Sequence, residues 1–172
     1  MSDAFEVLGL PVSYATSPAQ VQRAYMARAA AAHPDSAGGT DAELDAEAAS
    51  ARLNQAKDTL LDDEQRAAVV LARLGGPAAN QDRSLPPALL ADVMDKRSEF
   101  ENAQGKGNAH AMEALRDWAN CQRQHRIATV SGLFEKAAAL PPGPERVPLL
   151  KAIRTELNAW RYIERMLEQV SD

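Results

Sequence analysis

The tripeptide His33-Pro34-Asp35 carries the strongest chemical signal in the sequence. Proline fixes its own φ angle and stiffens the loop around it. The imidazole of His33 and the carboxylate of Asp35 can donate and accept hydrogen bonds, and a stiff loop lowers the entropy cost of offering them to a partner. We therefore interpret the tripeptide as a recognition element that implies no covalent chemistry. An ordinary proline-containing turn is the alternative.

A second pair of reactive side chains, Cys121 and His125, lies four residues apart and would share one face of a helix. A thiol and an imidazole can bind a metal ion, or the imidazole can activate the thiol. Two ligands do not complete a structural zinc site, so we expect a buried thiol, no metal site and no cofactor. The sequence also lacks a phosphate-binding glycine loop and a nucleophile–base pair, so we expect no enzyme activity.

Composition excludes several classes of function. The net charge of −5 disfavours nucleic acid, whose phosphate backbone selects a basic surface, and suits an anionic membrane equally badly. Hydrophobic residues make up 45% of the chain and aromatic residues only 5%, which favours closely packed helices over a β-sandwich. No run of about 18 apolar residues could span a membrane, and the acidic first residues are unlike a secretory signal. Because the chain also has a single cysteine, we expect a soluble protein of the cytoplasm.

The elements that must position the tripeptide begin with two predicted helices. A short helix over 4–10 is closed by Gly9. Ser17-Pro18-Ala19-Gln20 is a strong start for the second helix, because serine and glutamine can form a capping box around a proline at the first helical position. Pro34 ends this second helix at about residue 32 or 33. The tripeptide is therefore predicted to lie in the loop that leaves it.

Two more helices are predicted before the first glycine-rich break. Thr40 and Glu43 form a capping box for a helix that runs to about Leu61. Asp62-Asp63 caps the next helix, which stops at Gly75-Gly76-Pro77. Helical spacing predicts six inward-facing residues in the longer of the two: Leu44, Ala48, Ala51, Leu53, Ala56 and Leu60.

The C-terminal half reads as three helices. Residues 75–87 are rich in glycine, proline, asparagine and serine, which predicts a linker before them. The first helix starts after Pro86-Pro87, and glycine and proline clusters at 105–108 and 141–144 separate it from the other two. Three helices with short turns can bury their apolar stripes only against one another, so we expect an antiparallel bundle.

The capped helix, His33-Pro34-Asp35 in its exit loop and the returning capped helix together resemble the J domain. Residues 5–10, Phe-Glu-Val-Leu-Gly-Leu, look like the J-domain opening, and residues 53–60 look like its third helix. The resemblance implies an all-α chain: a J domain over 1–76 with the tripeptide in a helical hairpin, a linker over 77–87 and a three-helix client-binding domain over 88–172. It also implies a DnaK-type ATPase chaperone as partner.

Other stretches resemble one branch of these proteins, the HscB family of iron–sulfur co-chaperones. They are Asn54-Gln55-Ala56, Arg66-Ala67, Leu71-Ala72-Arg73-Leu74-Gly75, Leu89 to Arg97, and Leu157 to Tyr162. This resemblance implies an adaptor that stimulates ATP hydrolysis by an HscA-like chaperone and delivers the iron–sulfur scaffold protein IscU to it. The alternatives are a J-domain co-chaperone for a different client and an inactive helical interaction module.

The resemblance assigns chaperone binding to His33, Pro34 and Asp35, together with Arg23 and Arg28. J domains usually carry a basic second helix, whereas the two arginines are the only cations here. At about 100° per residue they lie about 140° apart and form no tight stripe. A solvated helix face is the alternative for both.

The resemblance assigns client binding to the first bundle helix and to one aromatic residue on the last. The corresponding residues are Leu90, Ala91, Met94, Asp95, Ser98 and Tyr162. Acidic positions of the family read Ser98 and Asn102 in this chain. Leu90 and Met94 share one side of their helix with residue 97, and two interpretations stay open for them: client interface or bundle core.

Overall fold

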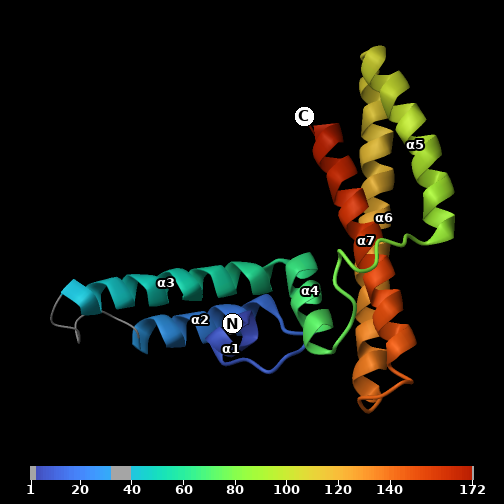
Figure 1. The fold of residues 1–172 in the computed structure, drawn as a ribbon. Helices are drawn as coiled ribbons and strands as arrows, with labels where there is room; N and C mark the ends of the chain where they lie inside the picture. Colours follow the sequence, from blue (N-terminus) through green and yellow to red (C-terminus); the bar gives the residue numbers. More distant parts are fainter. Residues whose placement is uncertain (1–2, 32–39, 172) are drawn as a thin grey trace. The chain divides into compact units, whose positions relative to one another are not determined.

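The computed structural model describes residues 3–31 and 40–171, with side chains described for 3–31 and 45–169. All regular elements of the described residues are α-helices, which confirms the predicted all-α fold (Figure 1). They are α1 (Ala4–Leu8), α2 (Pro18–Ala31), α3 (Thr40–Leu61), α4 (Asp63–Arg73), α5 (Pro87–Gly105), α6 (Ala109–Ala139) and α7 (Val147–Ser171). The chain divides into two compact units, Met1–Arg73 and Leu74–Asp172.

The first unit is built around α3. Helix α2 runs antiparallel to it as a hairpin, and α1 packs against both (Figure 1). Among the described residues, its core contains ten buried hydrophobic side chains: Phe5, Leu8, Tyr14, Val21, Leu53, Ala56, Leu60, Ala67, Val70 and Leu71. Fully burying a valine, leucine or phenylalanine side chain stabilises a domain by about 1.5–3 kcal/mol, so these apolar contacts hold the unit together.

The inward face of α3 differs in part from the prediction. Leu53, Ala56 and Leu60 are buried, whereas Ala48 and Ala51 are exposed and that part of the prediction is wrong. The side chain of Leu44 lies outside the described residues. The half-buried residues before Leu53 are Ala46 and Ala49, which continue its stripe at alternating spacings of three and four residues. Ala48 and Ala51 lie about 140° and 200° away from Leu53 around the helix.

Side-chain caps account for most helix starts in this unit. The Ser17 amide donates to Gln20 Oε1 at 2.8 Å and the Gln20 amide donates to Ser17 Oγ at 3.3 Å, which confirms the capping box. Asp62 Oδ1 accepts from the Gln65 amide at 2.8 Å, as predicted. The side chains of Thr40 and Glu43 lie outside the described residues. Gly9 ends α1 with φ 68°, a left-handed conformation that favours glycine.

An ion-pair cluster joins the first helix of the unit to the last. Asp3 caps α1 and also accepts from Arg73 of α4, whose second nitrogen lies 3.3 Å from Glu6 Oε2. The hydrogen bond from Arg73 holds the pKa of Asp3 below its usual value, although partial burial opposes it. A depressed carboxyl pKa stabilises the fold above the unfolded value near 3.8, and this contribution is lost as the pH falls through the lowered pKa.

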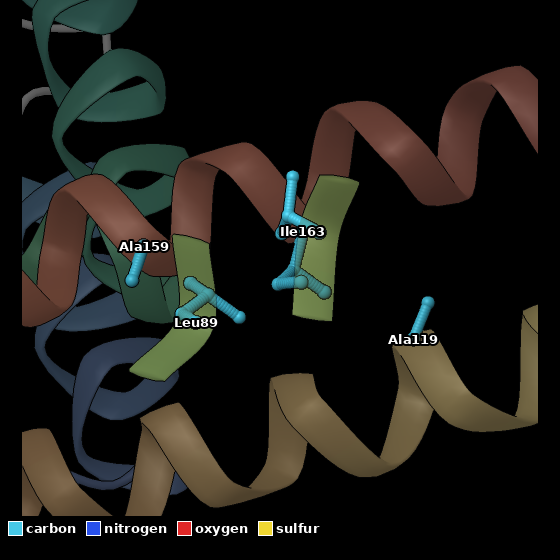
Figure 2. Packing of buried hydrophobic residues seen from close by; sticks show 5 residues of the cluster. Leu89, Ala119, Ala159 and Ile163 are labelled. Carbon is cyan, nitrogen blue, oxygen red and sulfur yellow. The ribbon is translucent and has the colours of Figure 1, made fainter. Parts of the chain in front are cut away.

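The second unit is an antiparallel bundle of α5, α6 and α7, as predicted (Figure 1). Helices α6 and α7 pack along much of their length, and α5 lies mainly against α6. One apolar cluster contains side chains of all three helices: Leu89 and Val93 of α5, Ala119 of α6, and Ala159 and Ile163 of α7. Figure 2 labels four of them, Leu89, Ala119, Ala159 and Ile163. Small alanine side chains let the backbones approach closely, which explains how an alanine-rich sequence fills this core.

Ion pairs along the bundle fix the register of α6 against α7. Arg126 Nη1 donates to Glu156 Oε2 at 2.8 Å, and Arg123 Nε lies 2.8 Å from Glu164 Oε1. The indole of Trp160 donates to the same Glu164 oxygen at 2.8 Å. Because these ion pairs join the two helices, a shift of either helix would leave charges unpaired.

The segment predicted as a linker is hydrogen-bonded to α7. Arg154 Nε donates to the Pro77 carbonyl at 2.9 Å, and the Asn158 amide donates to the carbonyls of Asp82 and Ser84, each at 3.0 Å. These contacts tie residues 77–84 to the second compact unit. The domain limits of 1–76 and 88–172 stay predictions. In the described part of the chain, no helix has the length and apolarity needed to cross a membrane.

Candidate functional site

The tripeptide His33-Pro34-Asp35 lies outside the described residues, between the end of α2 at Ala31 and the start of α3 at Thr40. Two contacts lock the hairpin that carries it. The Tyr25 hydroxyl on α2 donates to Asn54 Oδ1 on α3 at 2.8 Å, and Lys57 Nζ lies 4.9 Å from the centre of the Tyr25 ring. The hydrogen bond and the cation–π contact both join α2 to α3 in the described part of the hairpin.

The two arginines that were predicted to bind a chaperone differ in their surroundings. Both are exposed on α2, but the Arg28 guanidinium lies directly over Gly9, at the position that a side chain there would occupy. A partner reaching Arg28 would have to move it away from the α1 terminus. Arg23 is the more accessible cation of the two.

Met26 is a surface residue that the sequence reasoning missed. It is 59% exposed on α2, three residues after Arg23, and therefore next to it on the helix surface. A large apolar side chain in water is a common anchor of protein contacts. Its position about 140° away from the buried Val21 was a signal that could have identified it.

The role of Arg66 is a second feature that was not predicted from the sequence. It is buried, and its guanidinium donates to the Tyr14 carbonyl at 3.1 Å, the Leu60 carbonyl at 2.7 Å and the Asp63 carboxylate. It also lies 5.2 Å from the centre of the Tyr14 ring. One side chain thereby ties the loop before α2 to the end of α3 and the start of α4. Burial, reinforced by Asp63, raises the pKa of Tyr14 to about 12, so its hydroxyl stays neutral.

The predicted client residues of α5 all lie on the surface. Leu90 is 51% exposed and Met94 67% exposed, whereas their neighbours Leu89 and Val93 are buried in the bundle core. The core interpretation of Leu90 and Met94 is therefore wrong, because α5 turns the other apolar pair inward. Ala91, Asp95 and Ser98 are also exposed. We call Leu90 and Met94 the α5 ridge.

Polar residues further along α5 are bonded to their own helix. The Ser98 hydroxyl donates to the Met94 carbonyl at 3.2 Å, and the Asn102 amide donates to the Ser98 carbonyl at 2.9 Å. Neither side chain carries charge. At these two positions the residues that follow the ridge are therefore neutral side chains bonded to their own helix.

A groove of about 470 Å³ separates α5 from α7 beyond the ridge. It is lined by Arg97, Phe100, Glu101 and Gln104 of α5 and by Tyr162, Arg165, Met166 and Gln169 of α7. Tyr162 is half-buried and packs against the apolar cluster of Figure 2. Tyr162 thus lies in a groove beside the α5 ridge and faces the part of α5 that follows the ridge in sequence.

The exposure of Cys121 and His125 differs from the prediction. Both are exposed on α6, so the prediction of a buried thiol is wrong. Among the described side chains, no group of three or more histidine, cysteine, aspartate or glutamate residues could hold a metal ion. The surface of α6 turns the thiol outward because Leu115, Ala119 and Arg126 occupy the inward positions.

Comparison with known proteins gives one family match to the N-terminal part of the chain and relatives that match nearly its whole length. Residues 3–69 match the DnaJ domain family. The chain is 29% identical over 165 residues to a co-chaperone protein HscB homolog of Burkholderia mallei, with 94% of each chain covered. A homolog of the same name in Burkholderia vietnamiensis is 28% identical over 167 residues, again with 94% of each chain covered.

Two solved structures share the fold of the chain. The chaperone HscB from Vibrio cholerae superposes with a TM-score of 0.74 at 20% identity, covering 99% of this chain and 96% of that one. Human co-chaperone protein HscB superposes with a TM-score of 0.79 at 19% identity, covering 99% and 81%. The likeness therefore extends through both compact units.

Proposed function

We propose that this chain is a J-domain co-chaperone of the HscB family, that it stimulates ATP hydrolysis by a DnaK-type, HscA-like chaperone, and that it delivers the iron–sulfur scaffold protein IscU to that chaperone. The observation that carries this proposal is the presence, in one chain, of two helices, α2 and α3, joined by a side-chain hydrogen bond, and of an exposed apolar ridge on the bundle. The chain itself performs no bond-making step. We place this activity in the cytoplasm, in keeping with its single, unpaired cysteine.

On the chaperone side, α2 offers a partner few charged side chains. His33, Pro34 and Asp35 are the proposed contact residues, and Arg23 with Met26 adds a cation beside an exposed apolar side chain. An acidic chaperone surface would attract Arg23, whereas Met26 would exclude water from the contact. The proposed docking is therefore less dependent on charge than that of a J domain with a basic helix.

On the client side, the ridge supplies the apolar anchors. Leu90 and Met94 are exposed on a helix that Leu89 and Val93, about 100° away around its axis, anchor in the core, so the pair is already accessible to a partner. Asp95 and Ala91 flank them, and we propose both as peripheral contacts. A few central apolar residues of this kind usually dominate the affinity of an interface.

The ridge can be tested by replacing Leu90 and Met94 together with alanine. We expect IscU binding to weaken by about 1–2 kcal/mol for each lost anchor, while the melting temperature stays nearly unchanged because no core cavity forms. Calorimetric titration with IscU and thermal unfolding of the same variant measure the two effects. Val147→Ala is the matched control, because Val147 is 46% exposed at the start of α7. Unchanged binding, or a large fall in melting temperature, would contradict this assignment.

The two arginines should differ in effect. Arg23→Ala should raise the concentration of chain needed for half-maximal ATPase stimulation by about two- to fivefold at low salt, since an exposed ion pair contributes up to about 1 kcal/mol. The difference should shrink as added salt screens the charge. Arg28→Ala should have a smaller effect because its guanidinium lies over Gly9, against α1. Stimulation curves measured at two salt concentrations test this, and an Arg28→Ala effect as large as that of Arg23→Ala would refute the ranking.

A further inference from the structure

The segment between α4 and α5 is fastened to α7, although its composition predicts a linker. Near its start, the Pro77 carbonyl accepts from Arg154 Nε at 2.9 Å, and at its end Leu85 packs against the apolar cluster of the bundle. Figure 1 shows the segment running past α7 before it enters α5. We call residues 77–85 the strap.

Asn158 holds the middle of the strap. Its side-chain amide donates to the carbonyls of Asp82 and Ser84, each at 3.0 Å, so the two hydrogen bonds lie on either side of Arg83 in the chain. The hydroxyl oxygens of Ser84 and Thr155 lie 3.0 Å apart. Helix α7 therefore binds the strap mainly through backbone carbonyls, which are present whatever the side chains of the strap are.

The three α7 residues that hold the strap share one side of their helix. Arg154, Thr155 and Asn158 are separated by helical spacings of three and four residues. Arg154 is buried, and the other two are half-buried. Polar groups of this kind are normally hydrogen-bonded, and the docked strap supplies the acceptors. Each bond contributes little by itself, so docking can be reversed without unfolding the bundle.

Docking of the strap shortens the free chain that joins the two compact units. Only residues 74–76 lie between the end of α4 at Arg73 and the Pro77 carbonyl. Gly75 has a φ of 79°, and a Cβ atom there would meet nothing within 4 Å, so backbone conformation rather than packing favours glycine at this position. Three extended residues span at most about 10 Å, whereas the released segment 74–86 would span up to about 45 Å.

We infer that the strap is a releasable latch, which Arg154 and Asn158 hold closed and which limits how far the two compact units can move apart. When the latch is closed, motion between the units passes through the short hinge at 74–76. When it is open, about thirteen residues act as a flexible tether. Tether length sets the effective concentration at which a second contact forms once the first is made, so the latch would tune any task that uses both units. The inference goes beyond the proposed function, and its tests need neither chaperone nor client, so either can fail alone.

Trypsin cleavage after Arg83 reports on the latch. A protease needs a segment free of other contacts, so the cleavage rate follows the released fraction of the strap. Asn158→Asp keeps the size of the side chain but removes both donors, and it should speed the initial cleavage after Arg83 by about tenfold. Asn120→Asp makes the same change on the exposed surface of α6 and should be cleaved as the unchanged chain is. Mass spectrometry of the full-length folded chain identifies the fragment that ends at Arg83.

Spin labels on Cys121 and on an introduced Ala48→Cys measure the motion that the latch controls, because both positions are exposed and lie in different units. Pulsed electron paramagnetic resonance should give a distribution of distances that Asn158→Asp broadens and Asn120→Asp leaves unchanged. Ser84→Ala removes an exposed hydroxyl of the strap and should speed cleavage by about threefold. This variant carries the test if Asn158→Asp lowers the melting temperature.

Two outcomes would overturn the inference. Equal cleavage after Arg83 in the unchanged chain, Asn158→Asp and Ser84→Ala would show that α7 does not hold the strap. Faster cleavage without a broader distribution of distances would show that the strap is held but does not limit the motion between the units, and the latch would be refuted. Faster cleavage together with a broader distribution, in the strap variants alone, is the result we expect.

Discussion

Replacing His33 by glutamine is expected to abolish the stimulation of chaperone ATP hydrolysis while the chain keeps its helical content and melting temperature. The imidazole has two nitrogen positions that can donate or accept in the tripeptide's contact, and an amide side chain does not reproduce their placement. Substitutions away from a packed core usually change stability by no more than about 0.5 kcal/mol. Single-turnover ATPase assays with a DnaK-type chaperone, together with circular dichroism, measure both effects on one sample.

His110→Gln is the matched control, because it makes the same chemical change on the exposed surface of α6. It should stimulate the chaperone as the unchanged chain does. Full stimulation by His33→Gln would overturn the role proposed for the tripeptide. A loss of helical signal in the same variant would show that the histidine supports the fold, and the ATPase result would then carry no weight for recognition.

Replacing Arg66 by alanine should destabilise the first compact unit by about 3–5 kcal/mol, the usual cost of removing one partner from a buried charged network. The change removes donors to the Tyr14 and Leu60 carbonyls and leaves Asp63 without its cation. Each buried acceptor left unsatisfied costs about 1–3 kcal/mol. Denaturant unfolding followed by circular dichroism should show part of the helical signal lost at a lower denaturant concentration.

Two further variants interpret the Arg66 result. Arg66→Lys should recover only part of the stability, because an ammonium group cannot reproduce the fixed fork that reaches both carbonyls. Arg52→Ala, an exposed arginine on α3, should unfold as the unchanged chain does. If Arg66→Ala lost less than about 1 kcal/mol, water would have to replace the guanidinium at both carbonyls, and the proposed structural role would be wrong.

The local structure of this protein could be predicted from the sequence because its determinants are local. Ser17 with Gln20 and Asp62 with Gln65 meet within one helical turn, so the caps formed as their spacing indicated. Gly9 and the proline clusters ended helices for the same reason. The three-helix bundle also followed from the sequence, since no other arrangement buries three apolar stripes joined by short turns.

Which face of each helix is buried was decided only by the tertiary structure. Leu89 and Leu90 are adjacent and chemically identical, yet one is 1% exposed and the other 51%. The tertiary structure also decided that Met26 is exposed, that Arg66 is buried and that a groove lies at Arg165. Helical spacing tells which residues share a face, whereas burial depends on where a neighbouring helix lies, and that is set by contacts between residues far apart in the chain. The sequence by itself therefore determined the helices and the family resemblance, and only their packing decided which side chains remain on the surface to meet a partner.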